Sequence, residues 1–187
     1  KKLLVVLFSM IYMMSSCDTV SKETKSNEKM NDTLNIVSYA ENFKIYPIES
    51  GYKLVIKDLS SESEFYLFND TVSIPNYLTD KTIIRTPVNS VVAFSSTQWS
   101  VFQKLDEIDK VKGILESNYT TNKEILRLVA EGKILDAGMS TNVNTEKIIH
   151  LQPDVILVTP YPTVDYSNLK ELSGATMVSF PDYLESH

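Results

Sequence analysis

Few side chains in this sequence are suited to catalysis or to holding a metal ion. The 187 residues contain one cysteine, Cys17, and two histidines, His150 and His187. One cysteine allows no internal disulfide and no cysteine-built zinc site, and two histidines are too few for a multi-histidine metal centre. The five glycines form neither a Gly-x-Gly-x-x-Gly nor a Gly-x-x-x-x-Gly-Lys run, which excludes the common nucleotide-binding loops. We therefore expect no catalytic residues, no cofactor and no metal ligands.

The lone cysteine follows a segment with the order of a secretory signal. Two lysines precede the apolar stretch Leu3–Met14, and two serines separate that stretch from Cys17. The apolar stretch is shorter than the about 20 residues of a membrane-spanning helix. The run Met14–Cys17 resembles a bacterial lipobox, in which the cysteine is lipidated and the preceding peptide is removed; an incidental cysteine is the alternative. The resemblance implies a signal peptide at 1–16, a lipid anchor at Cys17, and attachment in the bacterial cell envelope on a periplasmic or surface face.

Two regions of different character follow the cysteine. Residues 17–33 are polar and lack periodicity, which predicts a flexible tether. Residues 34–82 carry β signals, with alternating or apolar runs that predict a small antiparallel β meander. Pro47 indicates an edge position for the first strand. The predicted strands are Phe43–Ile48, Tyr52–Lys57 and Glu64–Phe68.

Strands and helices alternate from residue 83 to residue 187. Short apolar runs predict strands at Val91–Phe94, Val111–Leu115, Ile134–Ala137, Asp154–Val158 and Ala175–Phe180. The first predicted helix is capped within Ser95–Thr97 and has Val101, Phe102 and Leu105 on its apolar face. The second begins within Thr121–Glu124. The third covers Thr145–Leu151 and is capped by Asn144, and the fourth covers Asp165–Leu172. This alternation predicts an α/β, Rossmann-like lobe with a parallel sheet and flanking helices.

Ligands of such sheets bind beyond the carboxyl ends of the strands. The loops expected there are rich in hydroxyl, amide and aromatic groups and nearly free of charge. That composition suits a sizeable ligand held by stacking and hydrogen bonds. The four loops are Ser95–Trp99, Glu116–Thr121, Gly138–Asn144 and Thr159–Val164.

Three stretches, Val91–Thr97, Leu105–Gly113 and Asn144–Leu157, resemble the amino-terminal lobe of ABC-importer substrate-binding proteins for iron-siderophore complexes, haem and cobalamin. The Asn-x-Glu…Leu-x-Pro-Asp-Val pattern is the most diagnostic part, and Leu172–Val178 fits the next helix-to-strand step. The resemblance covers residues 83–187. It implies two α/β lobes joined by a long helix, with the ligand between them. Because this sequence reaches Pro181–His187 where that helix would begin, the second lobe is expected to be missing from it.

The resemblance also assigns roles to individual residues. Glu146 corresponds to a glutamate that pairs with permease arginines during docking, although helix capping alone would also suit it. Ser96 or Thr97 could instead cap a helix, Trp99 could be core packing, and Tyr161 could be exposed without a ligand; a phenolate at Tyr161 could also ligate haem iron. His150 is interpreted as a surface helix residue. The residues expected to contact ligand are Ser96, Thr97, Gln98, Trp99, Tyr119, Met139, Ser140 and Tyr161.

These observations predict a monomeric, lipid-anchored receptor without catalysis of its own. It would deliver a metal-chelate or tetrapyrrole ligand to an ABC permease/ATPase complex. Bare zinc or manganese is disfavoured, because the relatives that bind them depend on histidines. The formal net charge of −6 argues against a nucleic-acid partner. Two alternatives are a lipoprotein hydrolase on an α/β scaffold, disfavoured by the absence of Gly-x-Ser-x-Gly, and an interaction lipoprotein in which the β meander is the working part.

Overall fold

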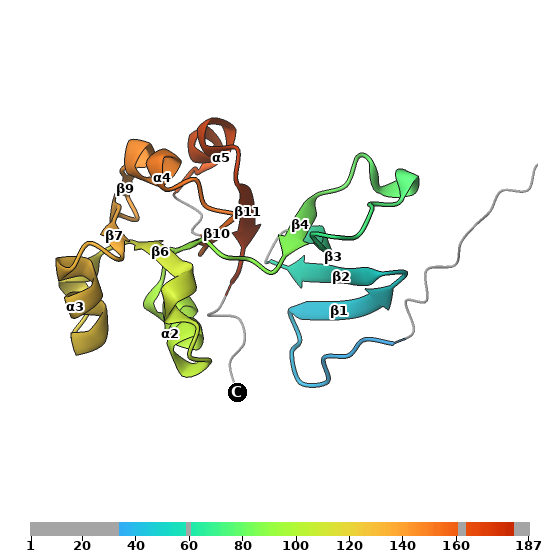
Figure 1. Ribbon diagram of the computed structural model, residues 1–187, viewed down its shortest axis with the longest axis horizontal. Coiled ribbons are helices and arrows are strands. Elements are labelled where there is room, and N and C mark those ends of the chain that lie inside the picture. Colours follow the sequence, from blue (N-terminus) through green and yellow to red (C-terminus); the bar gives the residue numbers. More distant parts are fainter. Residues whose placement is uncertain (1–33, 59–60, 161–163, 182–187) are drawn as a thin grey trace, which may run out of the picture.

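The described residues form a four-stranded β-sheet within 43–86, a five-stranded β-sheet within 91–179 and a separate two-stranded hairpin (Figure 1). The computed structural model describes residues 34–58, 61–160 and 164–181. The predicted signal peptide, Cys17 and the tether up to residue 33 lie outside the described residues, as do Tyr161 and His187.

The first sheet contains the predicted meander and one additional strand. Strands β1 (Phe43–Ile48), β2 (Gly51–Lys57) and β3 (Glu62–Asn69) pair antiparallel in sequence order. Strand β1 is at the edge, as Pro47 predicted, because a proline cannot donate to a second neighbour. After a 3₁₀ turn η1 (Asn76–Leu78), strand β4 (Ile83–Thr86) joins β3 in parallel. Residues 83–86 were predicted to belong to the α/β lobe. Their backbone hydrogen bonds are instead to the meander.

The second sheet confirms the predicted α/β fold, with five parallel strands in the order β11-β10-β5-β6-β7. All three residues of the central strand β5 are buried, as expected for a strand covered on both faces. The strands are β5 (Val91–Ala93), β6 (Val111–Ile114), β7 (Leu135–Asp136), β10 (Val155–Val158) and β11 (Thr176–Ser179). The helices are α2 (Ser96–Lys104), α3 (Lys123–Ala130), α4 (Thr145–Leu151) and α5 (Ser167–Ser173), with 3₁₀ turns η2 (Ile108–Lys110) and η3 (Ser117–Tyr119). A short hairpin, β8 (Gly138–Met139) and β9 (Asn142–Val143), was not predicted.

Two details of the helices correct the sequence analysis. Of the predicted apolar face of α2, Phe102 packs against the core, but Val101 and Leu105, the C-cap residue, are 49% and 68% exposed; Trp99 is buried against the sheet instead. The large indole of Trp99 faces the sheet. Residues on the same face of a helix are three or four positions apart, so Val101 cannot share that face with Trp99. In α3 the cap is Asn122 rather than Thr121, because its Oδ1 accepts hydrogen bonds from the backbone N–H groups of Glu124 and Ile125.

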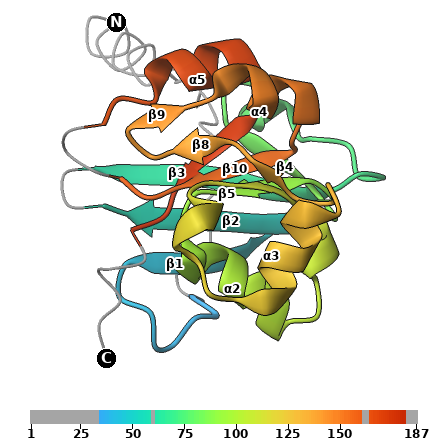
Figure 2. The same cartoon turned by 90° about the vertical axis from the view of Figure 1, so that its left-hand side faces the viewer.

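Different elements cover the two faces of the five-stranded sheet (Figures 1 and 2). Helices α4 and α5 place Ile148 and Leu169 against Ile156 of β10. Helices α2 and α3 cover the opposite face over β5 and β6. Over β10 and β11 that opposite face is covered by the four-stranded sheet, whose Phe65 shares a buried cluster with Val155 and other residues of these two strands. The first sheet thus takes the place of a flanking helix.

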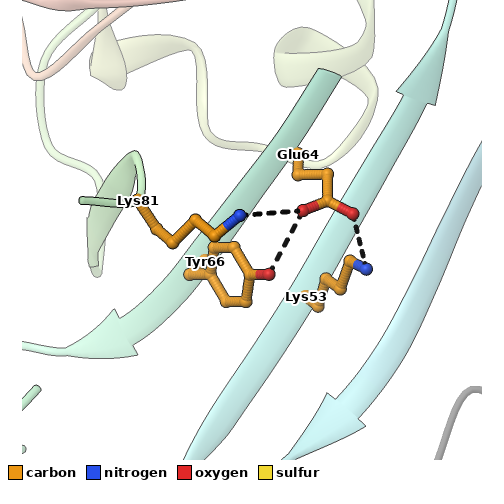
Figure 3. Close-up of polar contacts among 4 residues, drawn as sticks. All are labelled: Lys53, Glu64, Tyr66 and Lys81. Carbon is orange, nitrogen blue, oxygen red and sulfur yellow. Dashed lines mark hydrogen bonds and ion pairs between the residues drawn. The ribbon is translucent and has the colours of Figure 1, made fainter. Parts of the chain in front are cut away.

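The outer face of the first sheet carries a partly buried ion pair (Figure 3). Lys53 Nζ lies 2.6 Å from Glu64 Oε1, and the Lys53 side chain is only 9% exposed. Tyr66 donates its hydroxyl hydrogen to Glu64 Oε2 at 3.3 Å, and Lys81 Nζ lies 3.8 Å from the same oxygen. The hydrogen bond from Lys53 is the main reason why the pKa of Glu64 lies below its ordinary value, and partial burial opposes it.

We expect this carboxylate to make stability depend on pH. Because the pKa of Glu64 is lowered on folding, its contribution is complete above the ordinary value of 4.5 and is lost as the pH falls through the lowered value. The free energy of unfolding, measured with urea between about pH 5 and about pH 3, should fall more steeply in the wild type than in Glu64→Gln. Lys53→Gln removes the main cause of the shift and should flatten the dependence as well. A wild-type slope in Glu64→Gln would contradict the assignment.

Candidate functional site

A pocket of about 360 Å³ lies at the carboxyl edge of the parallel sheet. The chain passes from β5 to β6 and β7 on one side and later to β10 and β11 on the other, so the strand order reverses between β5 and β10. Such a reversal separates the loops that follow the two strands and leaves a crevice between them. The lining residues are Phe94, Ser95, Ser96, Trp99, Ile114, Leu115, Glu116, Ser117, Tyr119, Thr120, Thr121, Ser140, Thr159 and Tyr166.

The amide of Gln98 joins the loops on the two sides of this crevice. Its Oε1 accepts hydrogen bonds from the backbone N–H groups of Phe94, at 2.9 Å, and Ser95, at 3.2 Å. Its Nε2 donates to Thr159 Oγ1 at 3.2 Å, just after β10. Ser95 in turn caps α2 in a capping box with Gln98. Gln98 is 3% exposed, so it supports the pocket from within the protein rather than lining it.

Two carboxylates fix the loop after β6. Asp136, half-buried in β7, accepts hydrogen bonds from the backbone N–H and the hydroxyl of Ser117, and from the backbone N–H of Gly138. Glu116 accepts from the backbone N–H of Ser140 at 2.9 Å and from its hydroxyl at 2.7 Å. The β8–β9 hairpin, which contains Ser140, is thereby held against the wall of the pocket.

The structure brings four of the predicted ligand-contacting residues together in the pocket lining: Ser96, Trp99, Tyr119 and Ser140. Trp99 is 6% exposed and also packs in the core, so both of its interpretations apply in part. Tyr119 is 74% exposed at the rim.

Three other predicted residues, Thr97, Gln98 and Met139, do not line the pocket. Thr97 and Met139 are exposed elsewhere, and the Gln98 amide is engaged with backbone and Thr159. Tyr161 lies outside the described residues, so its role stays a prediction.

Ten other lining residues were not among those expected to contact ligand. Six of them lie in the loops expected at the carboxyl ends of the strands: Ser95, Glu116, Ser117, Thr120, Thr121 and Thr159. The other four, Phe94, Ile114, Leu115 and Tyr166, lie outside those loops. Tyr166 lies at the start of α5, and its ring packs edge-on against Phe94, with centroids 5.2 Å apart and an interplanar angle of 74°.

The two residues that were expected to lie away from the ligand, Glu146 and His150, are on the surface. Glu146 is exposed in the first turn of α4, and His150 is exposed in its last turn. Within the described ranges, no three His, Cys, Asp or Glu side chains are grouped so as to hold a metal ion. No helix in the same ranges is long and apolar enough to cross a membrane.

Comparisons with known proteins give two sequence relatives. No family model matches the chain. An uncharacterized lipoprotein of Methanocaldococcus jannaschii is 33% identical over 177 residues, covering 84% of this chain and 42% of the relative. A second uncharacterized lipoprotein of that organism is 29% identical over 175 residues, covering 89% and 43%. The chain thus spans about two-fifths of the length of these curated relatives.

Solved structures also match part of the chain, and one example is a bacterial substrate-binding protein. It is the iron uptake ABC transporter substrate-binding protein PiuA from Streptococcus pneumoniae, with a TM-score of 0.44 and 20% sequence identity. The match covers 67% of this chain and 36% of PiuA.

We expect the Gln98 amide to be required for the stability of the pocket. In Gln98→Ala the Ser95 N–H loses its bond to the amide oxygen, the Phe94 N–H keeps only its bond to the Leu157 carbonyl, and Thr159 Oγ1 loses a donor, which should lower the free energy of unfolding by about 1–3 kcal/mol. Thr97→Ala, one residue away and exposed, should change it by less than about 0.5 kcal/mol. Urea unfolding of both variants makes the comparison, and equal values would contradict a supporting role for Gln98.

Proposed function

We propose that this protein is the lipid-anchored substrate-binding component of an ABC importer, capturing an iron-siderophore, haem or cobalamin-type ligand. The observation that carries the proposal is the pocket at the reversal between β5 and β10, lined by hydroxyl and aromatic groups from four separate loops. Its volume of about 360 Å³ is within the range of small-molecule sites. The sequence resemblance described above points to the same place for the ligand.

The pocket supplies contacts suited to one side of a large, rigid ligand. Tyr119 and the accessible part of Trp99 provide aromatic surface, and Ser96 and Ser140 provide hydroxyl groups. Aromatic rings contribute large apolar contact area, and the hydroxyl groups orient the ligand's polar edge. A second lobe, as the resemblance implies, would close on the opposite side of the ligand.

Docking to the permease is assigned to Glu146. Its carboxylate is exposed, and no ion pair engages it among the described residues. An exposed carboxylate is available to an arginine of a membrane partner, and such charge pairing accelerates encounter without requiring high affinity.

Membrane attachment is assigned to Cys17, after removal of residues 1–16. Support comes from the signal-like segment before Cys17 and from the names of the two relatives, both called lipoproteins. Both relatives are archaeal, so they favour a cell-envelope location without supporting a bacterial origin. The proposed organisation is a tether at 17–33, a β extension and the lobe; the boundary predicted between residues 82 and 83 is moved to follow β4, which pairs with β3.

The hydrolase alternative finds no support in the pocket. No histidine is among its described lining residues, and His150 is exposed on α4. The serines among these lining residues therefore lack the Ser–His pair that commonly activates a serine nucleophile.

Ligand binding can be tested by filling the pocket. The full-length protein is titrated with a ferric hydroxamate, haem and cobalamin, and Ser96→Trp is compared with Thr97→Trp. Both positions are exposed in the same turn of α2, but only Ser96 lines the pocket. The indole at position 96 should weaken binding at least about tenfold, equivalent to about 1.4 kcal/mol, and the indole at 97 should not. Failure of all three ligands to bind, or equal affinities for the two variants, would overturn the proposal.

Docking can be tested separately by reversing a charge. Glu146→Arg should abolish co-purification of the full-length protein with its permease and leave ligand affinity unchanged, because the pocket is lined by other residues. Glu62→Arg makes the same charge change at an exposed site on β3 and should retain co-purification. Undiminished co-purification of Glu146→Arg would remove the docking role from this residue.

A further inference from the structure

Glu116 is the only charged side chain among the described residues that line the pocket. The other lining residues are apolar, aromatic or hydroxyl-bearing, and no lysine or arginine is among them. The pocket on this lobe therefore has a net negative charge and no cation to compensate a negatively charged ligand.

The carboxylate of Glu116 is held in place by its own loop. The residue has left-handed backbone angles, φ 58° and ψ 40°, which are unusual for a side chain other than glycine. Its backbone N–H donates to the carbonyl of Gly138 at 2.8 Å, which fixes this conformation. Its Oε1 accepts both hydrogen bonds from Ser140. These contacts determine where the negative charge lies.

The second carboxylate oxygen is available to a ligand. Oε2 of Glu116 has no hydrogen bond to any described residue, and the side chain is only half-buried. Hydrogen bonds to one oxygen orient the group, while the other oxygen can receive a donor or lie near a cation. A charge in a partly desolvated pocket also acts more strongly than the same charge on an open surface.

We propose that Glu116 is a specificity-determining residue that makes the pocket select neutral or cationic metal chelates and exclude polyanionic ones. This inference rests on the proposed function and names the charge class of the ligand. A cationic chelate gains attraction to the carboxylate, a neutral chelate can donate a hydrogen bond to Oε2, and a trianionic chelate is repelled. Ferric complexes of hydroxamates fall in the favoured class, and ferric tris-catecholates fall in the excluded class.

The test measures the affinity of the full-length protein for three ferric chelates of similar size and different charge. They are a neutral trihydroxamate, a trihydroxamate that carries an ammonium group, and a trianionic tris-catecholate. The variant is Glu116→Gln, which removes the charge and keeps an amide oxygen to accept from Ser140. Glu107→Gln is the matched control, because it removes an exposed charge just before β6, at the opposite edge of the sheet.

In the wild type the cationic and neutral chelates should bind and the trianionic one should bind at least about a hundredfold more weakly. Glu116→Gln should weaken the cationic chelate about tenfold, leave the neutral chelate within about threefold, and tighten the trianionic one. In the wild type, added salt should weaken binding of the cationic chelate, and in Glu116→Gln this salt effect should be reduced. Glu107→Gln should reproduce the wild-type order.

Three outcomes would overturn the inference. Tightest binding of the trianionic chelate by the wild type would contradict the charge selection. If Glu116→Gln changed the affinities for all three chelates equally, Glu116 would be only a structural contact of Ser140. If it changed none of these affinities, Glu116 would have no role in binding. In each of these cases chelates still bind, so the receptor function stands; failure of every chelate to bind would overturn that function and this inference together.

Discussion

The pocket depends on one buried amide, that of Gln98. Where the strand order of a parallel sheet reverses, the loops that follow the two neighbouring strands diverge beyond the last backbone hydrogen bond, which here runs from the Phe94 N–H to the Leu157 carbonyl. Beyond that bond Gln98 connects the two loops, because it accepts from two backbone N–H groups after β5 and donates to Thr159 after β10. A side chain that satisfies three buried groups at once fixes both walls of the crevice. With both walls fixed, hydroxyl and aromatic side chains on these loops are sufficient to line the pocket.

The rest of the pocket wall is fixed by carboxylates that bind the backbone. Asp136 holds the loop after β6 to the end of β7, and Glu116 holds the β8–β9 hairpin. Both use hydrogen bonds from an anion to N–H groups, which are stronger than neutral ones. The two carboxylates differ in the number of oxygens that bond within the protein. Asp136 uses both of its oxygens, and Glu116 uses one.

Continuous apolar runs and cap residues made much of this fold predictable. Strands β5 and β10 are short runs of mostly buried apolar residues, and Asn144 caps α4 through its side chain. Strands β8 and β9 have two residues each, which is too short for any periodicity to appear. Strand β4 resembles the parallel strands that follow it, and only its pairing with β3 assigns it to the first sheet.

The site was predictable in place but not in detail. Loops at the carboxyl ends of parallel strands bring Ser96, Tyr119 and Ser140 together whatever their sequence. The buried role of Gln98 depends on a partner 61 residues away, Thr159, which no local pattern reveals. The importance of Glu116 likewise depends on a left-handed backbone and a contact with a hairpin that was not foreseen.

The packing of one sheet upon the other has a consequence for how the chain unfolds. Phe65 and Ile56 of the first sheet share a core with Val155 and Val178 of the second, and the rings of Phe43 and Phe180 lie 6.1 Å apart. Opening the meander would expose the apolar side of β10 and β11 to water. We therefore expect the meander and the lobe to protect each other's amides from hydrogen exchange and to unfold as one cooperative unit, although their sequences belong to different patterns.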